Sequence, residues 1–142
     1  MCRTAYDEAY LDSMIQKTRY LFKLIARNCL DVFGTITDYM NGEYRKYMDM
    51  GNPLYLNKTP KQILGSLSVS VDLSKDISEI YDEFILEWMA DIYTYLQWKY
   101  NIPSNEIICR IKAEELYKKY YPLHEASIDN GAEKLVRNFQ LF

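Results

Sequence analysis

The stretch from Asp76 to Asn101, DISEIYDEFILEWMADIYTYLQWKYN, carries the longest uninterrupted helical pattern in the C-terminal half of the sequence. Its apolar residues recur at spacings of three and four, which places them on one broad face of a helix. These residues are Tyr81, Phe84, Ile85, Trp88, Ile92, Tyr95 and Leu96. Such a face has to be buried, so we expect the rest of the chain to pack around this helix, with Trp88 at the centre of the core.

A row of carboxylates follows the opposite side of the same helix. Four acidic residues succeed one another at four-residue steps, with no lysine or arginine between them in the row: Glu79, Glu83, Glu87 and Asp91. Like charges at this spacing destabilise a helix slightly. Trp98 lies further along the same row, at its C-terminal end. The row is either a solvated helix face or a surface that steers a basic partner.

The composition predicts one globular domain over residues 1–142. Hydrophobic residues make up 49% and charged residues 26%, enough for a core that needs neither disulfides nor metal. The fourteen tyrosines are unusual, and a side chain with an apolar body and a polar tip suits either a core boundary or a contact surface. The net charge is −3 and no lysine or arginine cluster forms, so we expect no direct binding of nucleic acid.

The cysteines and the N-terminus predict a cytoplasmic protein. Cys2, Cys29 and Cys109 are odd in number and far apart, which is typical of reduced thiols. The first ten residues, MCRTAYDEAY, lack the apolar segment of a signal peptide. No run approaches the roughly 20 apolar residues that span a membrane, so we expect no membrane contact.

The periodicity as a whole predicts an all-α fold, a compact single-domain helical bundle of about five to seven helices. Two long helices are expected over residues 5–32 and 78–100. The first has acidic residues in its early turns and basic residues in its later turns, as the helix dipole favours. We expect the two to pack on each other, because each apolar stripe needs a partner of comparable length.

Caps and breakers predict the shorter helices. Thr59 and Pro60 are typical of an N-cap and the first residue of a helix, and Ser127 is expected to cap the last helix. Gly34 is expected to end the first long helix. The stretch SLSVSVDLS (66–74) alternates as a strand does, but no second strand pattern lies nearby. We expect it to form an extended linker laid on the helices.

Candidate catalytic residues are few. His124 is the only histidine, and Glu125 follows it, so the pair could transfer a proton. A lone histidine before a helix is more often structural, and we expect it to bond a backbone carbonyl and to hold the turn YYPLHEAS (120–127) near Trp98. The sequence has no ligand spacing typical of a metal site and no glycine-rich phosphate loop. We therefore expect neither a metal nor another cofactor.

Three stretches resemble a recurrent, largely uncharacterised group of small bacterial helical proteins: GNPLY (51–55), ILEWMADIYTYLQWKYNI (85–102) and YKKYYPLHEAS (117–127). Members of that group are seen beside toxin genes, including ADP-ribosyltransferase-like ones, where they look like antitoxin or immunity components. Asp91 departs from the pattern, which usually has an aromatic residue there. The resemblance is carried by motif residues that include Trp88, Tyr95, Gln97, His124 and Glu125.

Together with the acidic row and the missing catalytic motifs, the resemblance implies a non-enzymatic protein-binding inhibitor, antitoxin or immunity-like, that neutralises a partner enzyme. Its partner would be a basic toxin or a nucleic-acid-processing enzyme. The expected partner-binding residues are Glu79, Glu83, Glu87, Asp91 and Trp98. Three alternatives remain: an anti-defence inhibitor of a phage or mobile element, a self-associating helical subunit that forms a homo-oligomer, and a cryptic enzyme using His124 and Glu125.

Overall fold

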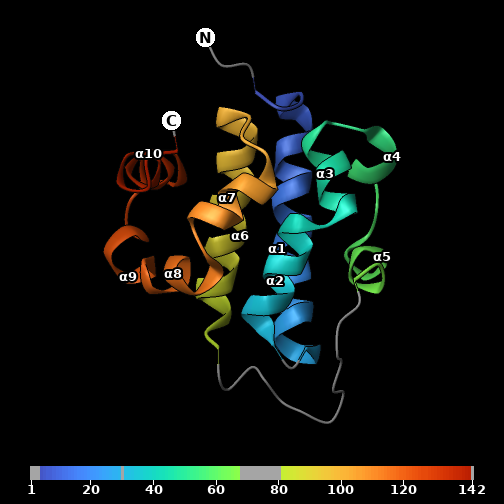
Figure 1. The fold of residues 1–142 in the computed structure, drawn as a ribbon, viewed down its shortest axis with the longest axis horizontal. Helices are drawn as coiled ribbons and strands as arrows, with labels where there is room; N and C mark the ends of the chain where they lie inside the picture. The colour runs from blue at the N-terminus through green and yellow to red at the C-terminus, as the bar shows by residue number, and fades with distance from the viewer. Residues whose placement is uncertain (1–3, 30, 68–80, 142) are drawn as a thin grey trace.

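The computed structural model describes residues 4–29, 31–67 and 81–141 (Figure 1). These residues form ten α-helices and one short 3-10 helix, and no β-strand occurs among them. The elements are η1 (Glu8–Tyr10), α1 (Leu11–Asn28), α2 (Val32–Asn41), α3 (Glu43–Asp49), α4 (Pro53–Leu56), α5 (Pro60–Gly65), α6 (Glu83–Tyr100), α7 (Ser104–Arg110), α8 (Ala113–Lys118), α9 (Tyr120–Leu123) and α10 (Ile128–Asn138). The all-α prediction is confirmed. The prediction of five to seven helices is wrong, because helices of four residues, such as α4 and α9, are too short to show a periodicity.

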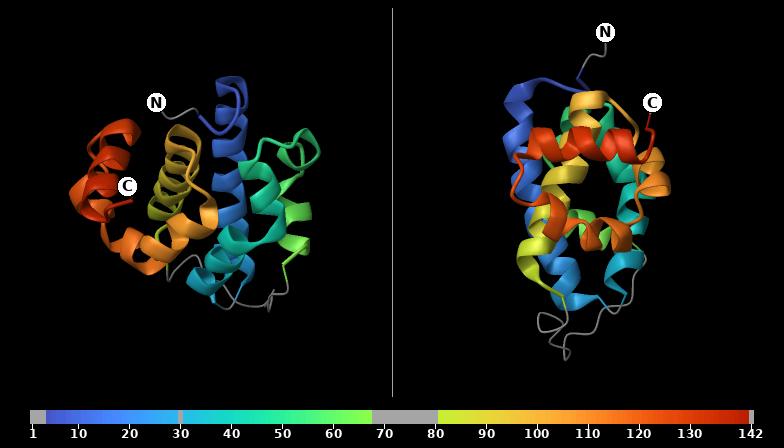
Figure 2. Two further views of the ribbon diagram at one scale, coloured as in Figure 1. Left: turned by 45° about the horizontal axis from the view of Figure 1, so that its top comes forward. Right: turned by 90° about the vertical axis from the view of Figure 1, so that its left-hand side faces the viewer.

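Helix α6 is the centre of the fold. It packs along α1 and also contacts α7, α8 and α10, and α10 lies across it in Figure 2. Buried positions therefore occur all round α6, well beyond the one predicted face: Ile85, Leu86, Trp88, Met89, Ala90, Asp91, Ile92, Tyr93, Thr94, Leu96, Gln97 and Trp98. Trp88 is 6% exposed, as expected for a core residue. Phe84 is 72% exposed, so its predicted burial is wrong; it lies in the first turn of α6.

The two long helices pack on each other as predicted, but both are shorter than predicted. Helix α1 begins at Leu11 because the chain before it is docked in another conformation on the C-terminal end of α6. The Ala5 N–H donates to the Trp98 carbonyl at 2.9 Å, and Trp98 Nε1 donates to the Tyr6 carbonyl at 2.8 Å. Main-chain groups bonded in this way cannot close helical turns. Asp7 then caps η1, its side chain accepting from the Ala9 N–H.

The boundary between α1 and α2 is set by Asp31. Its carboxylate accepts from the Gly34 N–H at 2.9 Å, so the new helix begins at Val32 and Gly34 lies inside its first turn. A Cβ at Gly34 would lie only 2.2 Å from that carboxylate, which explains the glycine. The predicted role of Gly34 as the end of the first helix is therefore wrong, since α1 already ends at Asn28.

Predictions from local caps are confirmed at two other helices. The Thr59 side chain accepts from the Gln62 N–H, and the Gln62 side chain accepts from the Thr59 N–H, forming a capping box before Pro60. Ser127 caps α10 by accepting from the Asn130 N–H. Asp82 caps α6 in the same way, so that helix begins at Glu83 rather than 78. The predicted linker 66–74 lies almost wholly outside the described residues.

Candidate functional site

The acidic row of α6 is paired with α1. The pairs are Asp91 with Arg19, Glu87 with Lys23, and Glu83 with Arg27. The order shows that α1 and α6 are antiparallel, with basic and acidic residues matched at four-residue steps. The row has no cation of its own on α6, as its sequence indicates, and the cations that pair with these three carboxylates come from another helix. Glu79 lies outside the described residues.

Asp91 is the most buried carboxylate of the three pairs. Arg19 donates from Nε and Nη2 to the two carboxylate oxygens, each at 2.6 Å, and the Asp91 side chain is only 9% exposed. These hydrogen bonds to Asp91 raise the pKa of Arg19. At the other end, the Arg27 and Glu83 side chains are 58% and 28% exposed, and the two contacts lengthen to 3.0 and 3.3 Å. The row is thus a structural seam between two helices, strongest where it is most buried.

Trp98, one of the expected partner-binding residues, is buried in this structure. The ring is 7% exposed, and its N–H is already used by the Tyr6 carbonyl. The neighbouring motif residue Tyr95 is half-buried and donates to Asp129 Oδ1 at 2.8 Å, which joins α6 to α10. Burial, with this hydrogen bond to the carboxylate, raises the pKa of Tyr95. Both aromatic residues therefore hold elements of this chain together.

His124 bonds a backbone carbonyl, as predicted. Its Nδ1 lies 2.9 Å from the Tyr120 carbonyl, which can only accept, so Nδ1 donates. The imidazole also stacks on the Tyr120 ring at a centroid distance of 4.3 Å. Tyr120 in turn meets Trp88 edge to face at 5.6 Å. The turn is thus held near Trp88, in the N-terminal half of α6, and not near Trp98, which corrects the prediction; Figure 1 shows α8 and α9 beside that half of α6. Glu125 is exposed, and no hydrogen bond or ion pair joins it to His124.

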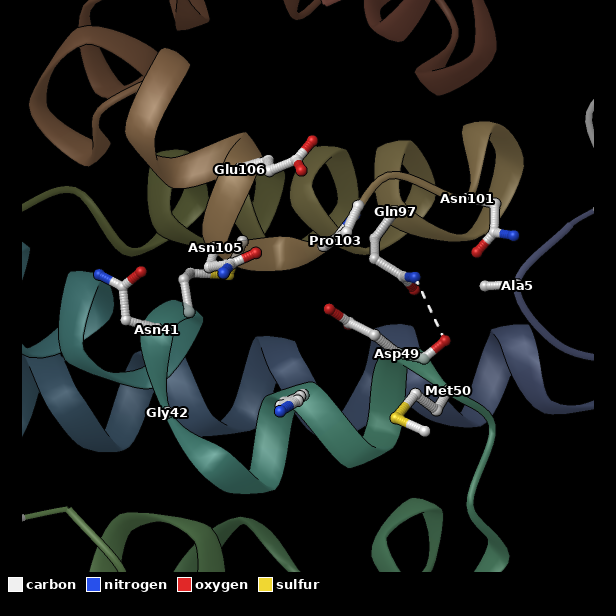
Figure 3. A pocket seen from close by; sticks show the side chains of 12 residues that line it. Ala5, Asn41, Gly42, Asp49, Met50, Gln97, Asn101, Pro103, Asn105 and Glu106 are labelled. Atoms are coloured by element: carbon white, nitrogen blue, oxygen red, sulfur yellow. Dashed lines mark hydrogen bonds between the residues drawn. The ribbon is translucent and has the colours of Figure 1, made fainter.

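A groove that the sequence did not predict opens between α2 and α3 on one side and the end of α6 and start of α7 on the other (Figure 3). Its volume is about 700 Å³, within the range typical of ligand-binding sites. Of the residues singled out from the sequence, only Gln97 lines it. The lining residues are Ala5, Met40, Asn41, Gly42, Lys46, Asp49, Met50, Gln97, Asn101, Pro103, Asn105 and Glu106.

A buried ion pair fixes the two walls of this groove relative to each other. Arg45 is 1% exposed and donates from Nε to Asp49 Oδ1 at 2.9 Å and to Ser104 Oγ at 2.8 Å. Its Nη1 donates to the Tyr39 hydroxyl at 2.9 Å. Asp49 also accepts from the Ser104 N–H at 2.7 Å, so a side chain of α3 caps the first turn of α7. Burial raises the pKa of Asp49, opposed by Arg45 and Ser104.

Polar atoms without partners gather at the same place. Among the described residues, Tyr6 Oη, Arg45 Nη2 and Gln97 Oε1 are buried without a hydrogen bond, as is Thr94 Oγ1 on α6. The Gln97 amide is oriented by its Nε2, which donates to the Asp49 carbonyl at 3.4 Å and leaves Oε1 free (Figure 3). Each such group costs about 1–3 kcal/mol of stability. Burial also raises the pKa of Tyr6 to about 12.

Two further properties of the described residues bear on function. No group of three histidine, cysteine, aspartate or glutamate side chains in them is arranged to hold a metal ion. Within ranges 4–29, 31–67 and 81–141, no helix has both the length and the apolar character of a membrane span. Cys29 is buried and Cys109 exposed, and both are free thiols.

Comparison of the chain with known protein families, with curated proteins and with solved structures found no match. The functional assignment therefore depends on the geometry of the groove and on the sequence motifs.

Proposed function

We propose that this chain is a non-enzymatic protein-binding inhibitor of the antitoxin or immunity kind, which neutralises a partner enzyme. The observation that supports it is an exposed apolar rim beside the groove. Met50 lines the groove and is 68% exposed, and Leu54 on the adjoining α4 is 64% exposed. Methionine and other large apolar side chains are enriched at protein interfaces, and solvent exposure of two so close in the chain favours a partner that covers them.

Contacts between aromatic side chains of α3 and α4 hold the rim in place. Tyr47 and Tyr55 stack at a centroid distance of 4.6 Å, and Tyr44 meets Tyr55 edge to face at 5.3 Å. These rings join α3 to α4 and hold Leu54 on a rigid base. A rigid apolar surface loses little conformational entropy on association, which favours binding of a folded partner.

The geometry at His124 supports an inhibitor over the alternative of an enzyme. The Nδ1 atom donates to a main-chain carbonyl, and the imidazole is stacked against Tyr120. The neighbouring Glu125 carboxylate is exposed. Proton transfer would need these two groups to converge with a nucleophile in a concave site.

The experiment is co-expression with the product of the gene next to this one. We expect the chain to rescue growth when that product is toxic, and to form a stable complex with it during gel filtration. Met50→Lys and Leu54→Lys should weaken the complex. The matched control is Phe84→Lys, which places the same charge on another exposed apolar position about 20 Å away along α6 from Gln97.

Absence of both rescue and complex formation would refute the proposal. Sedimentation of the pure protein tests the self-associating alternative independently, since that alternative requires a concentration-dependent oligomer. A monomer that forms a complex only with the neighbouring gene product supports the inhibitor.

A further inference from the structure

We propose that the groove between α3 and α7 receives an arginine side chain of the protein partner, with Gln97 Oε1 as its buried acceptor and Glu106 as its counter-charge. The inference rests on the proposed function, because it names the chemistry of the partner that the inhibitor would bind. It starts from the one groove-lining side chain that is both buried and incompletely bonded. Gln97 is 1% exposed, and its Oε1 has no partner among the described residues.

The Gln97 Oε1 atom can accept a hydrogen bond that the described residues do not supply. Its amide cannot turn over to offer N–H groups instead, because Nε2 already donates to the Asp49 carbonyl and an oxygen in that place would face another oxygen. An anionic ligand would bring hydrogen-bond acceptors to an oxygen that can itself only accept. A purely apolar ligand would seal that oxygen away from water unpaired. A ligand with N–H donors therefore fits best.

Other residues that line the groove provide further hydrogen-bond acceptors. Glu106 on α7 is exposed, with no ion pair within the described residues, and the side chains of Asn101 and Asn105 make no hydrogen bond there. Figure 3 shows all three side chains lining the same opening as Gln97. A guanidinium carries a permanent charge and five N–H donors in one plane, so it can bond acceptors on different walls together. A lysine ammonium presents its donors from a single atom.

Apolar atoms suit the stem of the same side chain. Met40, Met50 and Pro103 line the groove beside these acceptors. Arginine buries its aliphatic stem against such surface while its charged end is hydrogen bonded. The volume of about 700 Å³ leaves room for the flanking main chain as well, which would then lie over the rim formed by Met50 and Leu54.

Among the described residues, Lys46 is the one cation that lines the groove, and it has no acidic partner there, so it provides a sharp control. Arg45, directly before it, is already neutralised by Asp49, so the charges left for a ligand are those of Lys46 and Glu106. Lys46 is exposed, whereas Gln97 is buried. For a cationic ligand, reversing the charge of Lys46 should raise the affinity, and reversing the charge of Glu106 should lower it.

The test is a nuclear magnetic resonance titration of the isotope-labelled full chain with Nα-acetyl-arginine amide. The matched probe is Nα-acetyl-citrulline amide, which keeps the shape and loses the charge. We expect the arginine probe to shift the side-chain amide signals of Gln97, Asn101 and Asn105, and the citrulline probe to bind about tenfold more weakly. Equal affinity for the two probes, or shifts confined to other parts of the chain, would overturn the inference.

Three variants complete the experiment. Glu106→Lys should abolish the arginine-specific binding, Lys46→Glu should strengthen it, and Gln97→Met should weaken it at similar side-chain volume. Glu114→Lys, an exposed charge change on α8 outside the groove, is the control and should leave the affinity unchanged. The two surface reversals keep the test informative if the buried substitution does not fold.

Failure here is distinct from failure of the proposed function. Suppose that Glu106→Lys and Gln97→Met still form a complex with the neighbouring gene product and that the titration shows no preference for arginine. This result supports the inhibitor proposal and refutes the proposal that the groove binds arginine. Specific binding of the arginine probe without any complex supports the groove and refutes the inhibitor.

Discussion

Polar side chains are paired along the seam between α1 and α6, whereas some remain unpaired at the groove between α3 and α7. Along the seam, Glu83, Glu87 and Asp91 each pair with a cation of α1. At the groove, Arg45 Nη2 and Gln97 Oε1 are buried without partners in the described part of the chain. Folded proteins satisfy most of their buried polar groups, so the seam follows the rule and the groove departs from it.

The difference teaches where to look for function in this chain. The acidic row is conspicuous in the sequence, yet its charges are used to align two helices. The groove is inconspicuous in the sequence, yet it keeps costly unpaired groups and an exposed apolar rim. Features that lower stability are retained in a protein when its function needs them. For this groove, the proposed function that needs them is binding of a partner.

The largest effect is expected at the buried ion pair behind the groove. Arg45→Met keeps most of the side-chain volume but leaves the Asp49 carboxylate buried beside Ser104 without its cation. Loss of one partner of a buried pair costs about 3–5 kcal/mol, which we expect in the free energy of unfolding measured with urea. Lys46→Met, at the next and exposed position, is the control and should change it by less than about 0.5 kcal/mol.

The double variant Arg45→Met/Asp49→Leu sharpens this test. Removal of both charges should recover much of the lost stability, because apolar replacements of a buried pair are often neutral. If the single variant loses less than about 1 kcal/mol, water reaches Asp49 and the ion pair does not hold the groove walls.

The burial of Arg45 shows why the sequence could not predict the groove. Arg45 and Asp49 stand four residues apart, the spacing of an ordinary surface pair on a helix. Their burial depends on Ser104, nearly sixty residues further along the chain, and on how α3 meets α7. Such a contact has no periodicity. By contrast, the burial of Trp88 and the cap at Ser127 depend on local spacing and were predictable.

The ion pairs of the seam were predictable in part, less so than the burial of Trp88 and more so than the burial of Arg45. Arg19, Lys23 and Arg27 have the same four-residue spacing as the acidic row, so the sequence contained both halves of the match. Only the antiparallel register of α1 and α6 brings the two halves together, and register is a tertiary property. The start of α1 was likewise not predictable, since it depends on the docking of Ala5 and Tyr6 against Trp98.

A pH-dependent effect is expected at Tyr6, another unpaired group close to the buried pair. Burial raises the pKa of Tyr6 from 10.0 to about 12. Between these values the folded protein keeps a proton that the unfolded chain releases, so stability falls as the pH rises through this interval. The full contribution is on the order of 3 kcal/mol and is present below pH 10.

Comparison with Tyr6→Phe measures this contribution. The variant cannot ionise at this position, so its stability should fall less steeply above pH 10 than that of the parent protein. Tyr93 and Tyr95, whose pKa values are also raised by burial, remain in both proteins and cancel in the difference. Parallel stability curves in urea at alkaline pH would show that Tyr6 is accessible to water.

A smaller and graded effect is expected along the seam. Asp91→Asn removes the charge from the most buried pair and should cost about 1–3 kcal/mol, as expected for hydrogen bonds to a charged group. Glu83→Gln, at the exposed end, should cost less than about 0.5 kcal/mol. High salt should leave the first loss nearly unchanged and remove the second. Equal losses at the two positions would contradict the gradient in burial.

The smallest change in stability is expected at Gln97, where it separates the two regions most clearly. Gln97→Met fills a similar volume and removes the unpaired Oε1, along with one long hydrogen bond of 3.4 Å to the Asp49 carbonyl. The relief of an unsatisfied buried acceptor and the loss of a weak bond nearly cancel, so we expect the free energy of unfolding to change by less than about 1 kcal/mol.

Replacement of a seam residue whose only role is structural should lower the stability of the protein and leave binding of the partner intact. Gln97→Met should do the reverse, with unfolding in urea nearly unchanged and the complex with the partner weakened. Retained binding together with a marked loss of stability would show that Gln97 belongs to the core of α6 alone.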